Sequence, residues 1–204
     1  ITEGFEFMGV AGEKSIGADF LKCLKINYDF NHACGTHREP FKFSAIAVGN
    51  YQENGYYTIL SQTITREDNT WADLLKQPAL LTTPKTLNNE FEYSFPSTTS
   101  LVTTSFSGQI AQFFILYPQQ KNQTKTFVLL YAKPKHQLFG KSIFSLFRKD
   151  FLKAFDLVIE QDTTTLENLY PSQKPKIRLP REEIMFYAEQ LYREWGDDVS
   201  RESG

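Results

Sequence analysis

The chain has 204 residues, a formal net charge of −2 and no run of Lys or Arg, so its charge gives no sign of binding to nucleic acid or to a membrane surface. With 18 Phe and 10 Tyr it can build a sizeable core or an aromatic-lined cavity, and no apolar run approaches the length of a membrane span. Its two cysteines do not make a disulfide framework, which favours a reducing, cytoplasmic compartment.

The first predicted elements are an edge segment and a helix. Residues 1–15 are Gly-rich and predict a loop or a short edge strand. From Ser15 to Cys34 the apolar residues recur at roughly helical spacing, with Ser15 as the predicted N-cap and Gly35 as the end of the helix. Because the chain opens at Ile1 without a Met, we expect it to start inside a longer protein.

Two of the three histidines lie at the end of this predicted helix. Asp29, His32 and His37 offer a carboxylate and two imidazoles, which are common ligands of mid-series transition metals. If residues 29–32 form one helical turn, the Asp29 carboxylate can hold the outer nitrogen of the His32 ring while the inner nitrogen binds a metal. The third histidine, His136, lies on a predicted loop and is interpreted as structural.

From residue 41 to about residue 134 the apolar pattern has the period of two that is typical of strands. The predicted strands are 41–48, 56–60, 91–95, 101–106, 109–117 and 124–133. Gly49-Asn50, Asn54-Gly55 and Ser107-Gly108 predict turns, so the strands form an antiparallel meander, interrupted by an excursion over residues 66–90. Side chains on these strands that could line a cavity are Phe106, Phe113, Leu116, Phe127 and Leu129.

A long helix is predicted from about Ser142 to Leu169, and it carries a carboxylate in its apolar stripe. The stripe consists of Phe151, Phe155, Val158, Leu166 and Leu169. Asp162 fills the one gap in register. An unpaired buried carboxylate costs on the order of several kcal/mol, comparable with the stability of a whole domain, so Asp162 needs a cation, a proton or a metal.

The last segments are a connector, a helix and a tail. Pro171, Pro175 and Pro180 predict an extended connector, and residues 182–195 predict a final amphipathic helix ended by Gly196. Residues 197–204 are predicted to be disordered.

Asp29, His32, His37 and Asp162 are therefore the candidate metal set. Two imidazoles and one carboxylate on one side of a metal, with the other positions open, form the facial triad of non-haem Fe(II) oxygenases. The candidate substrate-pocket walls, one turn from Asp162, are Phe155, Val158 and Ile159. An alternative zinc site would use Cys23, His32, Cys34 and His37, which suit tetrahedral zinc, but it would leave Asp162 without a partner.

The spacing Asp29-x2-His32-x4-His37, followed by Glu160-Gln161-Asp162 on a long helix, resembles the catalytic domain of the Rieske-type aromatic ring-hydroxylating oxygenase alpha subunit. Asn27-Tyr28-Asp29 and Arg193-Glu194-Trp195 are also similar to that family, and the likeness covers most of the chain in order and spacing. It implies an α+β helix-grip (Bet v 1/START-like) fold, in which a curved antiparallel sheet wraps around a long C-terminal helix. The order of strands followed by a long helix agrees with that implication.

The resemblance implies that His32, His37 and Asp162 ligate mononuclear Fe(II), and that Asp29 bridges His32 to the cluster of a neighbouring subunit. It further implies a homotrimer, a ferredoxin or reductase as electron donor, and O2-dependent hydroxylation or demethylation of an apolar or aromatic substrate. A Rieske [2Fe-2S] domain needs both a Cys-x-His and a Cys-x2-His pair, and only Cys34 to His37 has either spacing. We therefore expect residues 1–204 to be a single catalytic domain, with the cluster on a domain upstream of residue 1 or on a partner. A chain that has lost the activity is the third alternative.

The same architecture also serves binding modules that hold lipids or other apolar ligands without catalysis. This alternative stays open from the sequence. The feature that separates the two functions is the polar set, because a purely apolar pocket has no use for two histidines and an aspartate that converge on one point.

Overall fold

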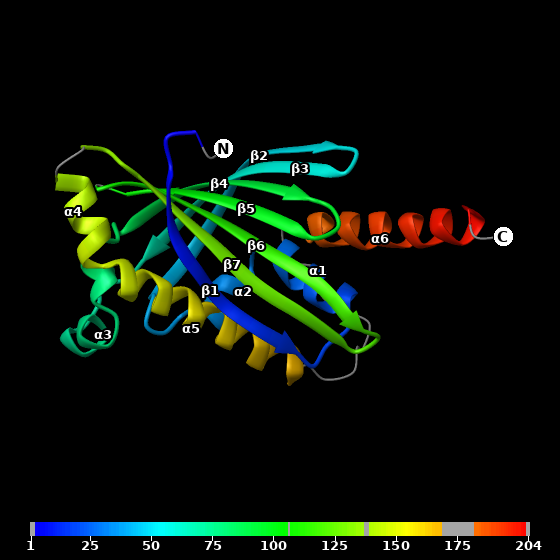
Figure 1. Cartoon of the computed structure of the whole chain (residues 1–204), viewed down its shortest axis with the longest axis horizontal. Coiled ribbons are helices and arrows are strands. Elements are labelled where there is room, and N and C mark those ends of the chain that lie inside the picture. Colours follow the sequence, from blue (N-terminus) through cyan, green and yellow to red (C-terminus); the bar gives the residue numbers. More distant parts are fainter. Residues whose placement is uncertain (1–2, 106, 137–138, 169–181, 203–204) are drawn as a thin grey trace.

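The computed structural model describes residues 3–105, 107–136, 139–168 and 182–202. These residues form a seven-stranded antiparallel sheet in the order β1-β7-β6-β5-β4-β3-β2, with helices packed against it (Figure 1). The strands are β1 Glu6–Ile16, β2 Phe43–Asn54, β3 Tyr57–Arg66, β4 Thr86–Ser94, β5 Thr98–Thr104, β6 Gly108–Gln120 and β7 Gln123–Pro134. The predicted meander is thus confirmed for β2 to β7.

The described helices are α1 Phe20–Tyr28, α2 His32–Thr36, α3 Trp71–Lys76, the 3-10 helix η1 Pro78–Thr82, α4 Phe139–Leu146, α5 Arg148–Glu167 and α6 Glu183–Glu202. Helix α5 packs along β1, while α1 packs against β6, β7 and α6. In Figure 1, α6 runs out past the end of the sheet. This arrangement confirms the expected α+β helix-grip fold. None of the described helices is both long and apolar enough to cross a membrane.

Residues 6–16 form a full strand rather than a loop, because β1 pairs with β7 along nearly its whole length. Its register shifts twice, between Phe7 and Gly9 and between Ala11 and Lys14. At Gly12 the backbone has φ +62°, and an added Cβ would lie 2.4 Å from Ile159 Cγ1 of α5. The Gly12 amide also donates to Asp156 Oδ1 at 2.6 Å. This close approach sets the position of α5, and hence of Asp162, relative to the sheet.

The helix predicted from Ser15 to Cys34 is two helices with a break between them. Asp19, not Ser15, is the N-cap of α1, and its side chain accepts from the Lys22 amide. At Asp29 the backbone is extended, and the Asp29 carboxylate accepts from the Asn31 amide at 3.0 Å, an Asx turn that competes with the helix. Gly35 therefore lies inside α2 and does not end α1.

Other boundaries also differ from the predictions. The helix predicted over residues 142–169 is α4 and α5, which meet at Phe147, a residue without helical geometry and without a capping side chain. Gly49-Asn50 is a bulge inside β2 rather than a turn. The excursion ends at Thr86, where β4 begins. Helix α6 continues past Gly196 to Glu202, so the predicted disordered tail is wrong up to that residue. The proline connector and Leu169 lie outside the described residues.

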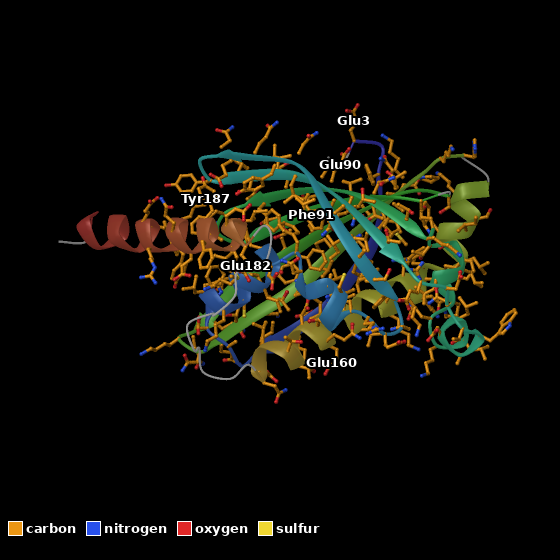
Figure 2. All side chains as sticks on the ribbon, turned by 180° about the vertical axis from the view of Figure 1, so that it is seen from behind. Glu3, Glu90, Phe91, Glu160, Glu182 and Tyr187 are labelled. Carbon is orange, nitrogen blue, oxygen red and sulfur yellow. The ribbon has the colours of Figure 1, made fainter. Side chains whose placement is uncertain are left out.

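Side chains of the sheet alternate between an outer face and a face that the helices cover. On β4 the neighbouring Glu90 and Phe91, both labelled in Figure 2, illustrate the alternation, because Glu90 is exposed while Phe91 lines an internal cavity. This cavity lies between the covered face of the sheet and helices α2 and α5, and its lining residues come from both layers. The metal-site candidates lie in its wall.

Candidate metal centre

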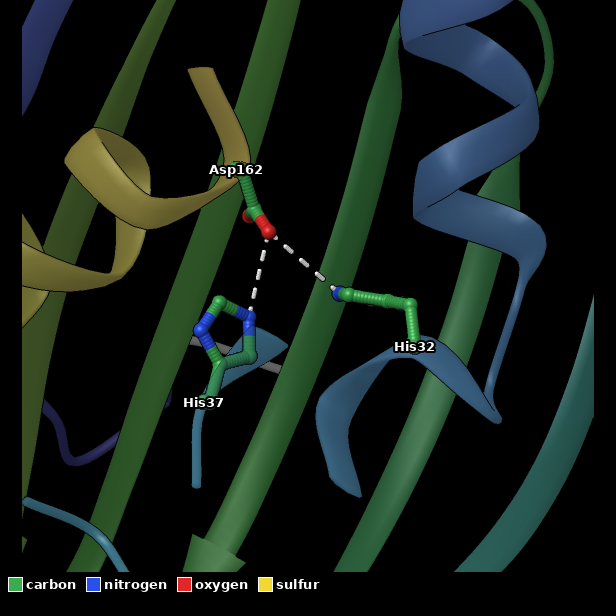
Figure 3. Close-up of side chains that lie close together, drawn as sticks. All are labelled: His32, His37 and Asp162. Carbon is green, nitrogen blue, oxygen red and sulfur yellow. Dashed lines mark ion pairs between the residues drawn. The ribbon is translucent and has the colours of Figure 1, made fainter. Parts of the chain in front are cut away.

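Three of the four predicted metal-site residues meet in space. His32 and His37 come from α2 and its C-cap, and Asp162 comes from α5 (Figure 3). Asp162 Oδ1 lies 3.1 Å from His37 Nε2 and 3.5 Å from His32 Nε2. One ligand atom from each residue lies within 4.8 Å of the other two. A separation of more than 120 residues along the chain is therefore closed by the packing of α5 beside α2.

The proton position on His32 follows from its contact with the backbone. His32 Nδ1 lies in a very short contact with the carbonyl oxygen of Asp29. A carbonyl oxygen only accepts hydrogen bonds, so Nδ1 carries the hydrogen and donates it. In the neutral ring Nε2 then presents a lone pair toward Asp162, which is the form that binds a metal.

His37 is held in the same tautomer by a side chain. His37 Nδ1 lies 2.9 Å from Gln161 Oε1, and Gln161 Nε2 donates to the carbonyl of Glu39 at 2.6 Å. The second contact fixes the amide of Gln161, because only its NH2 group can donate to a carbonyl. Gln161 Oε1 therefore accepts from His37, and the Nε2 lone pair of His37 is directed at the cluster.

The cluster has the charge and orphaned acceptor expected of a cation site. The Asp162 side chain is 13% exposed, and its buried Oδ1 accepts no hydrogen bond within the described residues. Two imidazole lone pairs and a carboxylate oxygen repel one another unless a proton or a metal ion lies between them. The set of two neutral imidazoles and one carboxylate fits Fe(II) and leaves further coordination positions free.

The charges of the cluster shift the pKa values of Asp162 and His32. Burial acts to raise the pKa of Asp162, but the two histidines outweigh it and lower that pKa to about 2. For His32, burial acts to lower the pKa, and Asp162 together with Asp29 outweighs it, so that the pKa is raised. The metal-free cluster therefore takes up a proton more readily than a free histidine does.

Asp29 lies beside the cluster and not within it. It lines the cavity, and its backbone carbonyl makes the contact with His32 that the sequence assigned to its carboxylate. The carboxylate instead accepts from the Asn31 amide. The expectation of a carboxylate hydrogen bond to the His32 ring is thus corrected, because the extended backbone at Asp29 turns its carbonyl to the ring.

The predicted pocket walls separate into two groups. Phe155 and Val158 line the cavity, whose volume is about 220 Å³. Ile159 does not, because it is 4% exposed and packs beneath Gly12 of β1 on the other side of α5. Ile159 points about 100° away from Val158 around the helix, which directs it to β1 rather than to the cavity.

Aromatic side chains form the wall next to the histidines. Phe30 packs edge-on against Phe91 and Tyr93, which stack in parallel at 5.9 Å between ring centroids. The Tyr93 hydroxyl is buried and has no hydrogen-bond partner within the described residues, and burial raises its pKa well above the ordinary value. This end of the cavity is therefore lined by aromatic rings.

The alternative zinc set does not come together. The metal-compatible cluster in the described chain contains neither Cys23 nor Cys34. Cys23 lies on α1 and is buried in the core, and burial raises the pKa of its thiol to about 11, which disfavours the thiolate that binds zinc.

The sequence did not predict the role of Gln161 in orienting His37. Gln161 belongs to the Glu-Gln-Asp motif, but the motif does not reveal its hydrogen-bond partner.

No family model matches the chain, and no curated protein sequence matches it. Several solved structures, in contrast, are similar to this chain in fold. NdmA of Pseudomonas putida CBB5 with caffeine has 14% identity and a TM-score of 0.62, and the match covers 98% of this chain and 54% of that one. Dicamba monooxygenase bound to dicamba has 11% identity and a TM-score of 0.58, covering 95% and 60%. A quaternary ammonium Rieske monooxygenase has 10% identity and a TM-score of 0.59, covering 95% and 51%.

The chain spans about half the length of these solved structures. At identities of 10–14% the likeness concerns the path of the backbone, and it extends over almost the whole of the described protein. The chain thus has the fold of the catalytic domains of Rieske-type oxygenases.

Proposed function

We propose that this chain is the catalytic domain of a mononuclear non-haem iron oxygenase, with His32, His37 and Asp162 as the ligands of Fe(II). The observation that carries the proposal is the convergence of two Nε2 lone pairs and an unbonded carboxylate oxygen in the wall of an internal cavity. The shared fold adds to it.

In this function the chain's own residues prepare the site. The carbonyl of Asp29 and the amide of Gln161 orient the two rings, and Asp162 supplies a negative charge that offsets part of the charge of a divalent ion. An Fe(II) ion held on one face by these ligands supplies the chemistry of O2 activation, with open positions for it. Phe155 and Val158 exclude water and hold an apolar substrate beside the metal donors.

The substrate class that we propose is an apolar or aromatic ring compound, and the reaction is hydroxylation or demethylation. The apolar, aromatic lining of the cavity supports this class. Structures with this fold hold caffeine in one case and dicamba in another, both of which are ring compounds.

The electrons would come from a [2Fe-2S] cluster outside residues 1–204, on an upstream domain or on a partner supplied by a ferredoxin or reductase. The chain spans about half the length of the similar structures, which supports a second domain elsewhere. Within a homotrimer, the carboxylate of Asp29 would link His32 to the cluster of the neighbouring subunit. The direct contact of Asp29 with the His32 ring is through its backbone carbonyl, and the Asp29 carboxylate is near enough to help raise the pKa of His32.

The test is the metal content of protein prepared without oxygen. The wild-type chain should bind about one Fe(II), and His37→Ala or Asp162→Ala should abolish binding. His136→Ala is the matched control, because His136 is exposed on a loop outside the cluster and its replacement should leave the iron content unchanged. Unchanged metal in both cluster variants would refute the proposal.

An apolar-ligand binding module is the second candidate, and the mostly apolar lining of the cavity is the observation that favours it. In that function the cavity matters and the metal does not. Recovery of a tightly held apolar ligand from metal-free protein, together with an absence of Fe(II) binding, would favour this candidate over the oxygenase.

A further inference from the structure

Four polar side chains cross the sheet inside the cavity, and neither the metal site nor the apolar lining uses them. Gln62, Asn89, Thr103 and Gln112 come from β3, β4, β5 and β6, and all four line the cavity. The three amides are 3–5% exposed. We call these four side chains the amide ladder.

The ladder is a chain of hydrogen bonds that runs across four strands. Gln112 Nε2 donates to Thr103 Oγ1 at 3.3 Å, and Thr103 Oγ1 donates to Asn89 Oδ1 at 2.9 Å. Asn89 Nδ2 then donates to Gln62 Oε1 at 3.2 Å. The strand register produces this order, because Gln62 pairs with Asn89 and Asn89 pairs with Thr103.

The ladder has more donors than it uses. Each amide offers two N–H hydrogens. Within the described residues both hydrogens of Gln62 Nε2 and one on each of Asn89 and Gln112 have no acceptor, while the Oε1 of Gln112 is the carbonyl left without a donor. None of these ladder atoms is among the fully buried unpaired polar atoms of the described residues, so they are accessible from the cavity. The strip is therefore suited to a ligand that brings an acceptor oxygen or nitrogen.

Apolar side chains beside the ladder leave room for a ring. The Phe114 ring of β6 meets the Phe155 ring of α5 at a tilt of 67°, with 6.4 Å between centroids, and both line the cavity. Phe155 precedes Asp162 by seven residues on α5, which is about 10 Å along a helix. A ring compound anchored on the ladder would thus share one cavity with the metal donors.

The buried cation in the lining does not provide a competing anchor. Arg66 Nε donates to the carbonyl of Phe41, its NH1 to the carbonyls of Thr83 and Pro84, and its NH2 to Asn69 Oδ1. Its guanidinium therefore holds the β3–β4 connection in place. Apart from one N–H of Arg66 NH2, the hydrogen-bonding groups of the lining that stay unused within the described residues include the ladder amides and the Tyr93 hydroxyl. These groups are neutral and can solvate a neutral acceptor without a buried charge.

We infer that the amide ladder is a specificity site for a neutral ring compound that carries a carbonyl-type acceptor, such as a carboxamide or lactam. The carbonyl lies on the ladder, and the ring packs toward Phe114 and Phe155. The inference rests on the proposed function where it treats this compound as the substrate of the metal site, whereas binding to the ladder requires no metal.

The experiment measures binding of three compounds of similar shape to metal-free protein by calorimetry. 1-Naphthamide carries the neutral acceptor, 1-methylnaphthalene lacks it, and 1-naphthoate replaces it with an anion. We expect 1-naphthamide to bind about tenfold more tightly than 1-methylnaphthalene and more tightly than 1-naphthoate. Equal binding of the first two, or tightest binding of 1-naphthoate, would overturn the inference.

Substitutions in the ladder test whether the preference for 1-naphthamide comes from its side chains. Gln62→Leu should reduce the preference for 1-naphthamide to about twofold or less while 1-methylnaphthalene still binds. Thr103→Val is the conservative second variant, because it breaks the chain of hydrogen bonds with little change of volume. The control is Gln109→Leu, on β6 but on its other face, which should keep the full preference. A preference that survives both ladder variants would refute the inference.

Measuring Fe(II) in the same variants separates the two proposals. If the wild-type chain binds Fe(II) but shows no preference among the three compounds, the inference about the ladder is wrong and the oxygenase proposal is unaffected. If the chain prefers 1-naphthamide but binds no Fe(II), the oxygenase proposal is wrong and the inference about the ladder is unaffected.

Discussion

The cavity contains two sets of buried polar side chains that differ in how far they satisfy one another. In the amide ladder each member bonds to the next, from Gln112 through to Gln62. In the metal cluster, Asp162 Oδ1 accepts no hydrogen bond in the described chain although two imidazole nitrogens lie within 3.5 Å. The ladder satisfies part of its hydrogen bonding internally, whereas the cluster needs a positive charge.

The difference comes from the groups that orient each set. Carbonyl acceptors take the Nδ1 hydrogens of both histidines, which leaves only lone pairs facing the carboxylate. In the ladder, donors and acceptors alternate along the row. The two proposals thus assign two ligands of different chemistry to one cavity, a cation at the cluster and a neutral acceptor at the ladder.

Asp162→Asn should have the largest effect on the difference between the two sets, because it removes the negative charge of the cluster and leaves only neutral groups, as in the ladder. We expect Fe(II) affinity to fall by at least about 100-fold. Wild-type protein should gain about 2.7 kcal/mol of unfolding free energy when free Fe(II) is 100 times its dissociation constant, and the variant should gain almost none. Thermal unfolding with and without Fe(II) measures both.

The matched control for Asp162→Asn is Glu160→Gln. Glu160 is an exposed carboxylate on the same helix, paired with Lys14, so its removal should not change the stabilisation by Fe(II). Equal stabilisation of wild-type and Asp162→Asn proteins would show that Asp162 is not a ligand.

Gln161→Leu removes the acceptor that orients His37. Fe(II) affinity should fall by about 10- to 100-fold, because the ring loses its fixed tautomer and orientation. Gln161→Glu keeps an oxygen acceptor for Nδ1 but loses the hydrogen bond to the Glu39 carbonyl, so its affinity should lie between that of the Leu variant and that of the wild type. Titration of metal-free protein with Fe(II) measures the effect, and a Leu variant as tight as the wild type would contradict it.

The two sets should respond differently to pH. Since Asp162 and Asp29 raise the pKa of His32, the metal-free cluster keeps a proton that the metal must displace. Fe(II) affinity should therefore rise with pH, by up to about tenfold per unit, and level off above the raised pKa of His32. Binding of 1-naphthamide should stay flat between about pH 6 and 8, because the ladder contains no group that titrates there. Iron affinity that falls with rising pH would refute the expectation.

Gly12→Ala should have the smallest effect of these substitutions, and it should act on the metal cluster and on the amide ladder together. The added Cβ would lie 2.4 Å from Ile159 Cγ1 at a φ of +62°, so α5 must shift. We expect a loss of about 1–3 kcal/mol in unfolding free energy. Gly55→Ala is the control, with φ +56° but open space around the Cβ, so it should cost only the backbone strain of about 1 kcal/mol. Equal losses, measured by denaturant unfolding, would rule out the packing effect.

The sequence by itself determined the features that depend on local pattern. Alternating apolar residues predicted the meander, and the stripe of Phe151, Phe155, Val158 and Leu166 exposed Asp162 as a carboxylate that needed a partner. The spacing of His32 and His37 predicted the partner. These inferences held because periodicity reports which side of an element is buried and because an isolated buried charge is costly wherever it lies.

Only the tertiary structure decided what depends on contacts between distant segments. Phe113 and Tyr131 meet on the outer face of the sheet, and Ile159 turns to β1 instead of the cavity. Strand periodicity identifies two faces but not which one the helices cover. The partner of Gln161 and the row of amides on four strands were likewise invisible in the sequence, because a hydrogen bond across a sheet or between helices is set by register and packing.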